Sequence, residues 1–187
     1  MNEQVKFYVG DDILLKEIGL EDVEAIFHTI DTEREYMAEW LPFVELTQDI
    51  SFTRKFIENY IDSEEKDLTC VIYYKQQFVG LVGLKDTDYD NLKVEIGYWL
   101  SESFQHKGII TRSCKALIDY AFKELKMNRI QIKAATENIK SQAVAERLGF
   151  TREGIERDGE LHSRGFVDLV VFGLLQKDWT TEKEIIS

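Results

Sequence analysis

The segment from Gln105 to Thr111 has the residue types of an anion-binding turn. It reads Q-H-K-G-I-I-T and lies between a β-rich stretch that ends near Leu100 and a helical pattern that begins near Gly108. The first turn of a helix presents unpaired backbone N–H groups at its positive end, and these groups bind phosphate. A glycine there lets the backbone approach an anion without an intervening side chain. An ordinary strand-to-helix turn is the competing interpretation, because glycine serves that purpose as well.

The stretch from Asn138 to Phe150 is a short helical pattern with polar residues at its start. It opens with N-I-K-S and closes with E-R-L-G-F. An asparagine caps a helix by accepting a backbone hydrogen bond, and a glycine after a helix ends it in a left-handed conformation. Capping by Asn138 and termination at Gly149 explain the segment without any chemistry, so its meaning depends on what accompanies it.

Strand patterns surround these two segments. Lys75, Gln76 and Gln77 predict a tight turn between two strands, and residues 88–91 predict the next break. Stretches rich in branched and aromatic residues, some of them strictly alternating, predict seven strands, at residues 13–18, 68–74, 78–84, 94–100, 129–135, 150–156 and 166–175.

Helical spacing of apolar residues predicts four helices. They cover residues 21–40, a segment that starts at Asp49 or Ser51, residues 108–125 and residues 138–149. Pro42 ends the first helix, because the residue before a proline is excluded from helical geometry. The apolar residues predicted to be buried on the second and third helices are Phe52, Phe56, Ile57, Tyr60 and Ile61, and Cys114, Leu117, Ile118, Ala121 and Phe122.

The element order is therefore β-α-α-β-β-β-α-β-α-β-β. The two strands that flank the helix at 108–125 are joined by a crossover, so we expect them to be parallel neighbours in an α/β fold. The chain has 187 residues, 44% of them hydrophobic, with no repeat and no linker composition. This predicts a single domain over 1–187 that buries roughly 70% of its unfolded surface.

The charge and the first residues limit the classes of protein. A formal net charge of -12, from 35 acidic and 23 basic residues, argues against a nucleic-acid binder. It suits cationic partners such as amines or basic proteins, although acidity that only maintains solubility is an equally good explanation. No stretch is apolar enough for a membrane span, and the first four residues are polar, which favours a cytoplasmic protein.

Metal and thiol chemistry have no support in the residue spacing. Cys70 and Cys114 are far apart with no CxxC motif, which predicts reduced thiols, and the three histidines are scattered singly. The sequence therefore predicts no metal site.

Taken together, the two candidate segments resemble those of the GNAT superfamily of acetyl-CoA-dependent N-acetyltransferases. The Gln105-x-x-Gly108 loop is similar to the family's pyrophosphate motif, and Asn138 to Phe150 is similar to its Asn-x-x-(Ala/Ser)…Gly-Phe segment. The likeness covers nearly the whole chain and is strongest for the branch that acetylates the N-termini of ribosomal proteins. The stretches that carry this second likeness are Trp40-Leu41-Pro42-Phe43, Glu95-Ile96-Gly97-Tyr98-Trp99-Leu100 and Glu146-Arg147-Leu148-Gly149-Phe150.

The resemblance implies a GNAT-like mixed sheet, mostly antiparallel with one splayed parallel pair, and acetyl-CoA as co-substrate. The backbone of Trp99 and Leu100 is implied to pair with the pantetheine arm, with Asn138 and Ser141 near the pantetheine and the sulfur. The pyrophosphate is implied to bind backbone N–H groups of the loop residues Gln105, His106, Lys107, Gly108, Ile109, Ile110 and Thr111.

Two departures from the family pattern concern the chemistry. Ile110 stands where relatives usually have glycine or alanine, which is expected to tighten the phosphate site. Ala145 replaces a tyrosine that in many relatives protonates the departing thiolate. Ser141, which the ribosomal-protein branch shares, is the best substitute for that proton donor, although a hydroxyl is a weak acid.

Glu95 is the best candidate to accept the proton of the acceptor amine, directly or through a water. It lies in a predicted central strand, where an unpaired carboxylate is costly. An outward-facing residue or one half of an ion pair is an equally good explanation. Trp40, Leu41 and Phe43 are candidates to border the acceptor groove, with core packing as the alternative.

The sequence thus predicts transfer of an acetyl group from acetyl-CoA to a primary amine, with the N-terminal α-amine of a basic, ribosomal protein as the preferred acceptor. A polyamine, an aminoglycoside or an amino acid is the alternative acceptor. A non-catalytic sensor of acyl-CoA is the alternative from another class. The oligomeric state, monomer or homo-oligomer, is left open by the sequence.

Overall fold

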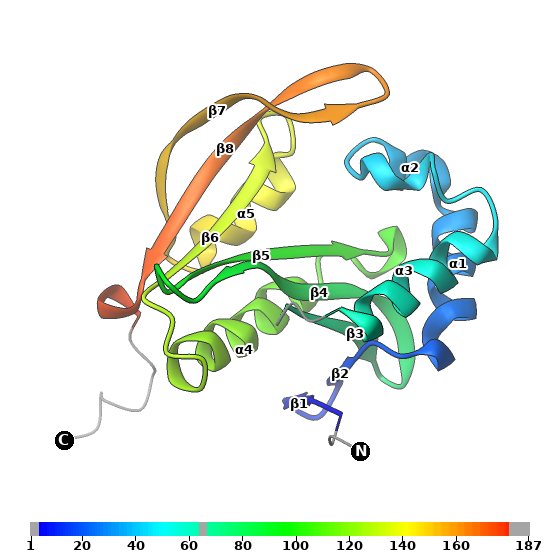
Figure 1. The fold of residues 1–187 in the computed structure, drawn as a ribbon, viewed down its shortest axis with the longest axis horizontal. Coiled ribbons are helices and arrows are strands. Elements are labelled where there is room, and N and C mark those ends of the chain that lie inside the picture. The colour runs from blue at the N-terminus through cyan, green and yellow to red at the C-terminus, as the bar shows by residue number, and fades with distance from the viewer. Residues whose placement is uncertain (1–3, 64–66, 180–187) are drawn as a thin grey trace.

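The computed structural model describes residues 4–63 and 67–179, which form one eight-stranded mixed sheet flanked by helices (Figure 1). The strands lie across the sheet in the order β1-β2-β3-β4-β5-β6-β8-β7. Their bounds are β1 (Lys6–Val9), β2 (Ile13–Glu17), β3 (Leu68–Tyr74), β4 (Gln77–Asp88), β5 (Lys93–Leu100), β6 (Arg129–Ala135), β7 (Thr151–His162) and β8 (Gly165–Leu175).

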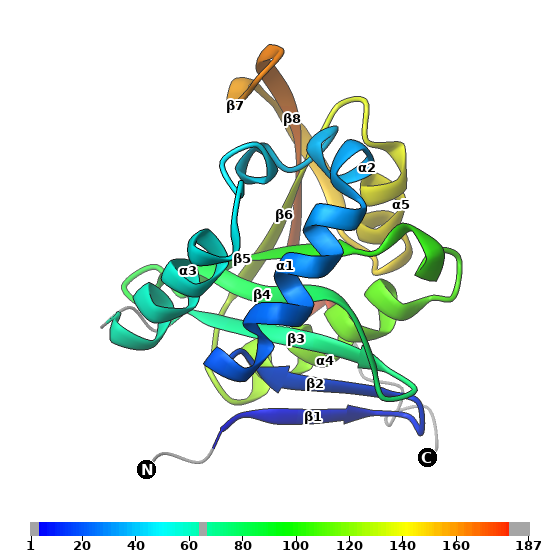
Figure 2. The ribbon, with the colours of Figure 1, turned by 90° about the vertical axis from the view of Figure 1, so that its right-hand side faces the viewer.

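The helices divide between the two faces of the sheet (Figure 2). One buried apolar cluster joins α4 and α5 to one face of the sheet, and a second joins α1, α2 and α3 to the other. Their bounds are α1 (Val23–Thr32), α2 (Arg34–Ala38), α3 (Ile50–Asp62), α4 (Ile109–Lys123) and α5 (Ile139–Arg147), with short 3-10 helices η1 (Leu20–Asp22), η2 (Pro42–Val44), η3 (Glu102–Phe104) and η4 (Gln176–Asp178).

The expected parallel pair is confirmed as β5 and β6, which the α4 crossover joins. The two strands pair over three residues only, Lys93–Glu95 with Arg129–Gln131. Beyond that point β5 continues beside β4 and β6 continues beside β8, so the two halves of the sheet diverge. The mostly antiparallel sheet with one splayed parallel pair is therefore the observed architecture.

The tight turn between β3 and β4 is also confirmed. Tyr74 pairs with Gln77, and both residues between them are left-handed, Lys75 at φ 50° and Gln76 at φ 69°. Two consecutive positive φ angles give the hairpin turn whose twist matches that of the flanking strands.

The N-terminal third differs from the expected order. The predicted helix over 21–40 is three pieces, η1, α1 and α2, because Glu33 leaves helical geometry at φ -110°. The four-residue edge strand β1 was not predicted, because it is too short for its alternation to stand out. Among the described residues, no helix is long and apolar enough to span a membrane.

The predicted buried face of α3 is partly wrong. Ile57 is fully buried, but Phe52 is 47% exposed, Phe56 49% and Ile61 52%. The helix packs chiefly against α1, and its buried residues are Thr53 and Ile57, so it buries only a narrow stripe. The apolar spacing identified the helix correctly but overstated the width of the face that it buries.

Candidate active site

The turn before α4 has the geometry of an anion site. Gly108 is the residue before the helix, with φ 68° and ψ 12°, and a Cβ built on it meets nothing within 4 Å. The backbone N–H groups of residues 109–111 have no possible partner within the helix, whose first such bond runs from Arg112 N to Gly108 O at 3.0 Å. The loop therefore presents backbone donors beside open space.

Side chains of this loop are anchored away from that space. The side chains of Ile109 and Ile110 are buried in the core cluster. The Lys107 Nζ donates to Ser103 O at 2.6 Å and lies 4.6 Å from the centroid of the Phe104 ring. His106 has φ 61°, a left-handed conformation that costs a non-glycine residue about 1–2 kcal/mol.

Hydrogen bonds tie the loop to helices on both sides of the sheet. The Gln105 side chain donates to the Tyr36 hydroxyl of α2 and accepts from Lys140 Nζ of α5 at 2.9 Å. Glu33, between α1 and α2, accepts from Ser101 Oγ at 2.6 Å and from the backbone N–H of Glu102 at 2.8 Å. The anion loop and the α1–α2 corner therefore form one connected structure.

The diverging edge of β5 carries Trp99 and Leu100. Both residues are paired on one side with β4, opposite Leu81 and Gly80, and neither is paired with β6. The Trp99 ring packs edge-on against Phe78 in the second core cluster, at 5.9 Å between centroids. This side of the strand therefore has unpaired backbone groups facing the opening between β5 and β6.

Asn138 caps α5, as expected, because its Oδ1 accepts from the backbone N–H of Ser141 at 3.0 Å. Gly149 ends the same helix at φ 80°. Ser141 also meets a residue to which the sequence gave no role. The Tyr98 hydroxyl lies 2.9 Å from Ser141 Oγ and donates to Ser141 O at 3.1 Å.

Tyr98 places a phenol beside the start of α5, the helix that has Ala145 in place of a tyrosine. Ala145 is fully buried and offers no hydroxyl. Burial raises the pKa of Tyr98 well above its ordinary value, so the phenol stays protonated and acts as a donor. The sequence signals for Tyr98 were its place in the stretch from Glu95 to Leu100 that carries the resemblance and its register, two residues after the core-facing Ile96.

Glu95 is 6% exposed and is held by partners from neighbouring strands. Its Oε1 lies 2.8 Å from Lys85 Nζ on β4, and its Oε2 accepts from Gln131 Nε2 on β6 at 2.9 Å. Lys133 Nζ lies 4.0 Å from Glu95 Oε2 and 2.8 Å from Glu156 Oε2 on β7. The carboxylate is thus one member of a charged network across the opening.

A second carboxylate near this network was not singled out from the sequence. Glu160 Oε2 lies 2.7 Å from Nε2 of the buried His162, and within the described residues the His162 Nδ1 has no hydrogen-bond partner. Desolvation lowers the pKa of Lys85, but the hydrogen bond and charge of Glu95, with smaller contributions that include Glu160, raise it overall. The Glu160 charge therefore acts on Lys85, which belongs to the same network.

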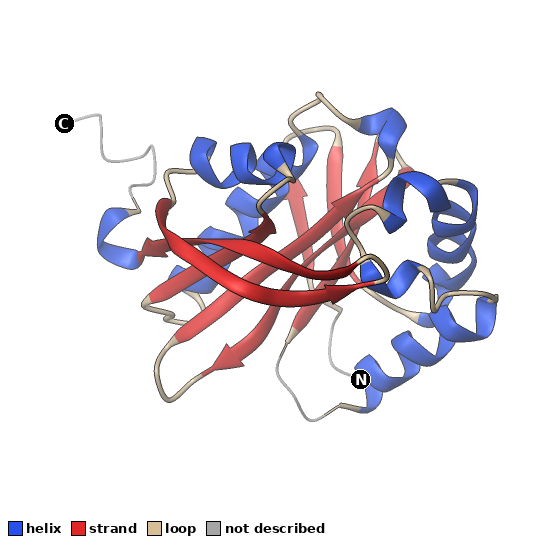
Figure 3. Ribbon diagram, turned by 90° about the horizontal axis from the view of Figure 1, so that it is seen from above, coloured by secondary structure: helices blue, strands red, loops and turns tan. Residues whose placement is uncertain are grey.

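Trp40, Leu41 and Phe43 lie on the other side of the opening. The Arg164 guanidinium, from the β7–β8 turn, lies 5.7 Å from the Trp40 ring centroid and pairs with Glu137 at 3.2 Å. Leu41 packs against the second core cluster, whereas Phe43 is exposed. Figure 1 shows the tip of the β7–β8 hairpin extending toward α2, and Figure 3 shows the long hairpin crossing above the other strands.

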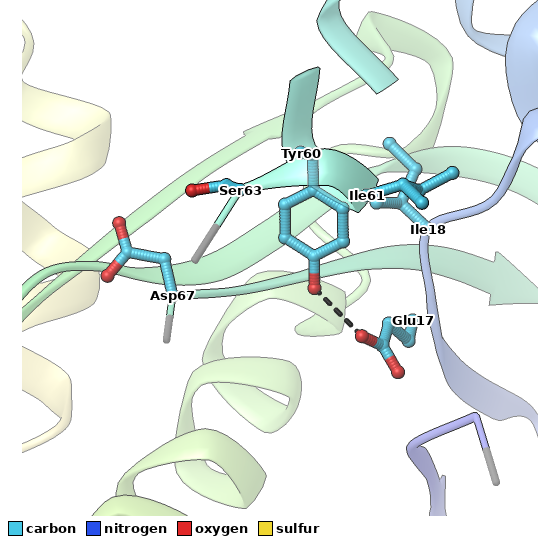
Figure 4. Close-up of a pocket in the computed structure, with 6 residues that line it drawn as sticks. All are labelled: Glu17, Ile18, Tyr60, Ile61, Ser63 and Asp67. Carbon is cyan, nitrogen blue, oxygen red and sulfur yellow. Dashed lines mark hydrogen bonds between the residues drawn. The ribbon is translucent and has the colours of Figure 1, made fainter. Parts of the chain in front are cut away.

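A surface pocket of about 250 Å³ lies elsewhere, between the end of α3 and strands β2 and β3 (Figure 4). Glu17 accepts there from the Tyr60 hydroxyl at 3.0 Å and from Val5 N at 3.0 Å. Asp67 accepts from Thr87 Oγ1 at 2.8 Å. Both carboxylates of this pocket therefore accept hydrogen bonds from the protein itself, and we do not consider it a candidate active site.

The cysteines are buried and unpaired. Burial raises the pKa of the Cys70 thiol to about 12 and also raises that of Cys114, so neither is a nucleophile. Among the described residues, no group of three or more His, Cys, Asp and Glu side chains could hold a metal ion.

Comparison with known proteins agrees with the family resemblance of the sequence. Residues 12–151 match the family described as "Acetyltransferase (GNAT) domain". YdaF from Bacillus subtilis (strain 168), whose name assigns it to the ribosomal N-acetyltransferases, is 36% identical over 178 residues, 94% of this chain and 97% of that protein. The ribosomal-protein-serine acetyltransferase of Escherichia coli (strain K12) is 25% identical over 174 residues, 92% and 96% of the two chains.

Among solved structures, the microcin C7 self-immunity acetyltransferase MccE, in complex with acetyl-CoA and AMP, superposes with a TM-score of 0.84. It is 31% identical, and the superposition covers 89% of this chain and 94% of that one.

Proposed function

The chain belongs to the GNAT acetyltransferase family, and from this premise we propose that it acetylates the N-terminal α-amine of a protein, with ribosomal proteins as the acceptor class. It is an N-acetyltransferase, and acetyl-CoA supplies the acetyl group as a thioester. The observation that carries the site assignment is the opening between β5 and β6, which has the anion turn of α4 and the Tyr98–Ser141 pair beside it.

The residues present fit acetyl-CoA. The open space at Gly108 and the donors of residues 109–111 suit its pyrophosphate. The unpaired edge of Trp99 and Leu100 suits the amides of its pantetheine arm, since those amides can complete a strand-like ladder. Asn138 acts through Ser141, whose backbone it fixes at the start of α5.

Ser141 is the proton donor of the proposal. Its hydroxyl is at the helix start that faces the opening, and Tyr98 supports it from the core side at 2.9 Å. The Tyr98 hydrogen can go to Ser141 O or to Ser141 Oγ. Either arrangement leaves the serine hydrogen for the sulfur of the leaving thiol, provided that Ser141 Oγ does not donate to the Tyr98 oxygen.

Glu95 is the proton acceptor of the proposal, and its replacement by glutamine is expected to lower turnover while acetyl-CoA affinity stays nearly unchanged. Glu95→Gln is also expected to change the pH–rate profile, because the variant lacks the group that accepts the proton. Because Lys85 and Gln131 hold the carboxylate, the substitution is expected to cost about 1–3 kcal/mol of stability as well.

The matched control for this variant is Glu153→Gln. Glu153 pairs with Arg129 on the same sheet, away from the opening, so its loss tests an ion pair without the chemistry. Equal turnover and an equal pH–rate profile in both variants would show that Glu95 is structural, and would leave the proton to water or to Glu160.

The choice of acceptor rests on chemistry and on the relatives. An α-amine has a pKa of about 8 against roughly 10.4 for lysine, so far more of it is neutral near pH 7. Because Lys85 and Gln131 already bind the Glu95 carboxylate, the site favours the amine that loses its proton more readily, which is the α-amine. The names of YdaF and of the Escherichia coli relative point to ribosomal proteins, and the net charge of -12 attracts basic acceptors.

A small amine is the second candidate acceptor. MccE, at 31% identity, was solved with AMP beside acetyl-CoA, which supports a small-molecule substrate for a protein of this fold. Binding of acetyl-CoA without turnover on any amine would instead identify a sensor.

The deciding experiment compares three acceptors under saturating acetyl-CoA by mass spectrometry. They are a basic peptide with a free N-terminus, the same peptide blocked at its N-terminus but carrying lysines, and spermidine. We expect acetylation of the free peptide at its α-amine, with weaker preference at high salt because exposed charges are screened. Preference for the blocked peptide or for spermidine would overturn the α-amine proposal and leave the family unchanged.

A further inference from the structure

The loop between β5 and α4 has an unfavourable backbone conformation just before its anion-binding turn. His106 is left-handed at φ 61°, and Gly108 follows at φ 68°. Glycine adopts this conformation readily, but a residue with a side chain keeps it only where surrounding contacts fix the chain. The side chains of His106 and Lys107 are exposed, so the core does not hold them. The conformation of the turn therefore depends on how the loop is held at its two ends.

The two ends of the loop are held in different ways. On the far side, Ile109 and Ile110 bury the start of α4 in the core. On the near side the loop begins with η3, whose N-cap residue, Ser101, does not cap it with its own side chain. The first orphan N–H group of η3 must therefore find its acceptor elsewhere in the molecule.

Glu33 supplies that acceptor from the α1–α2 corner. Its Oε2 accepts from the backbone N–H of Glu102, 69 positions later in the chain, at 2.8 Å. Its Oε1 accepts from Oγ of the buried Ser101 at 2.6 Å. The Glu33 carboxylate thus caps η3 from outside, in the place that the serine side chain leaves free.

The side chain of Glu33 makes no cap for its own helix. Glu33 is the N-cap residue of α2, yet it forms no side-chain capping bond there. Three residues further on, the Tyr36 hydroxyl accepts from the side chain of Gln105, which is the last residue of the η3 turn. Both ends of η3 are therefore fastened to the α1–α2 corner, the start by Glu33 and the end by Tyr36.

The charge of Glu33 and its hydrogen bonds act on a bound anion in opposite directions. A carboxylate near the anion loop repels a pyrophosphate, and this repulsion weakens acetyl-CoA binding. The bonds to Ser101 and Glu102 fix the loop and strengthen binding. Repulsion between groups open to solvent is screened over about 8 Å at physiological salt, whereas a hydrogen bond to a buried group is screened much less. The hydrogen bonds are expected to dominate.

We propose that Glu33 is a positioning residue for acetyl-CoA, which acts through the loop and does not touch the coenzyme. By capping η3, it holds His106 to Gly108 in the conformation that leaves room for the pyrophosphate beside the first-turn donors of α4. The inference rests on the proposed coenzyme site at Gly108. It gives the α1–α2 corner a part in binding the coenzyme, although this corner lies on the other face of the sheet from α4 and α5.

Two replacements of Glu33 separate its hydrogen bonds from its charge. Glu33→Met keeps the length of the side chain but removes both acceptors, and it is expected to raise the Kd for acetyl-CoA by about tenfold or more. In Glu33→Gln the amide oxygen can accept from Glu102 N–H while the amide nitrogen donates to Ser101 Oγ. This variant is expected to stay within about threefold of the unchanged protein. Both variants lose the same charge, so a charge effect would shift both equally, toward tighter binding.

Isothermal titration calorimetry with acetyl-CoA, well below the Tm of each variant, measures the effect. A variant that merely folds poorly binds fewer equivalents at an unchanged Kd, whereas loss of positioning raises the Kd at full stoichiometry. Glu35→Met is the matched control. Glu35 is exposed on α2, two residues from Glu33, and its replacement removes the same charge without loss of the η3 cap, so the Kd is expected to stay unchanged.

Three results would overturn the positioning role. They are an unchanged Kd in Glu33→Met, tighter binding in both Glu33 variants, and equal weakening in both, since the last would assign the effect to the charge. If Glu33→Met does not fold, Ser101→Ala decides. It removes one of the two bonds and is expected to raise the Kd by about threefold, and an unchanged Kd in this variant would overturn the role.

Gly108→Trp distinguishes this inference from the site on which it rests. If Gly108→Trp abolishes acetyl-CoA binding while Glu33→Met leaves it unchanged, only the positioning role is wrong. If Gly108→Trp leaves the Kd unchanged, the pyrophosphate does not bind at the start of α4, and the role of Glu33 is wrong with it.

Discussion

Replacing Gly108 by tryptophan is expected to abolish the thermal stabilisation that acetyl-CoA gives this protein. A ligand that binds only the folded state at 100 times its Kd stabilises it by about 2.7 kcal/mol, which is several degrees in Tm for a chain of this size. The Cβ position of Gly108 faces empty space beside the first-turn donors of α4, and in the proposed site a side chain there would occupy the place of the pyrophosphate. The loss of affinity is expected to exceed 100-fold, as measured by isothermal titration calorimetry.

Gly149→Trp is the control that separates this effect from strain. Gly149 is also left-handed, at φ 80°, is exposed, and also has nothing within 4 Å of a built Cβ. Both variants are expected to lose about 1–2 kcal/mol of stability from the conformation alone. Only the Gly108 variant is expected to lose the response to acetyl-CoA. Unchanged affinity in that variant would remove the pyrophosphate from the start of α4.

The local parts of this site could be predicted from the sequence. Gly108 and Gly149 stand at helix boundaries where the backbone has a positive φ angle, which glycine adopts readily. Asn138 caps the helix that follows it. The parallel pairing of the strands around α4 was predicted because a crossover joins them, and β5 and β6 are indeed parallel neighbours. The cap and the two glycines depend on residues only a few positions apart, whereas the strand pairing follows from the chain connection through α4.

The parts that depend on distant residues could not be predicted. Tyr98 and Ser141 are 43 positions apart, and no periodicity places a phenol on β5 beside the start of α5. Glu95 looked equally like a base and like half of an ion pair, because Lys85 and Gln131 come from two other strands. The break in the first helix has the same origin, since the Glu33 carboxylate binds Ser101 and Glu102.

Ser141→Ala is expected to lower the rate of acetyl transfer by about 100-fold or more, the usual value of a positioned proton donor. Acetyl-CoA affinity is expected to stay within about twofold, because the capping bond from Ser141 N to Asn138 uses the backbone. Single-turnover kinetics measure this rate, since product release can hide it in kcat. Ser113→Ala is the matched control: within the described residues the Ser113 Oγ has no partner, so its removal is expected to change nothing.

Tyr98→Phe distinguishes a lone serine from a relay. The Tyr98 hydroxyl lies 2.9 Å from Ser141 Oγ, and burial raises its pKa, so the phenol carries its hydrogen. If that hydrogen moves onto Ser141 Oγ as the serine hydrogen goes to the sulfur, the phenolate left on Tyr98 regains a proton from solvent. Removing the phenol then slows transfer by about tenfold and adds little to the Ser141→Ala loss, because both changes break one path. Additive losses would mean that the two hydroxyls act separately. A Ser141→Ala rate within about twofold of the unchanged protein would assign the proton to water.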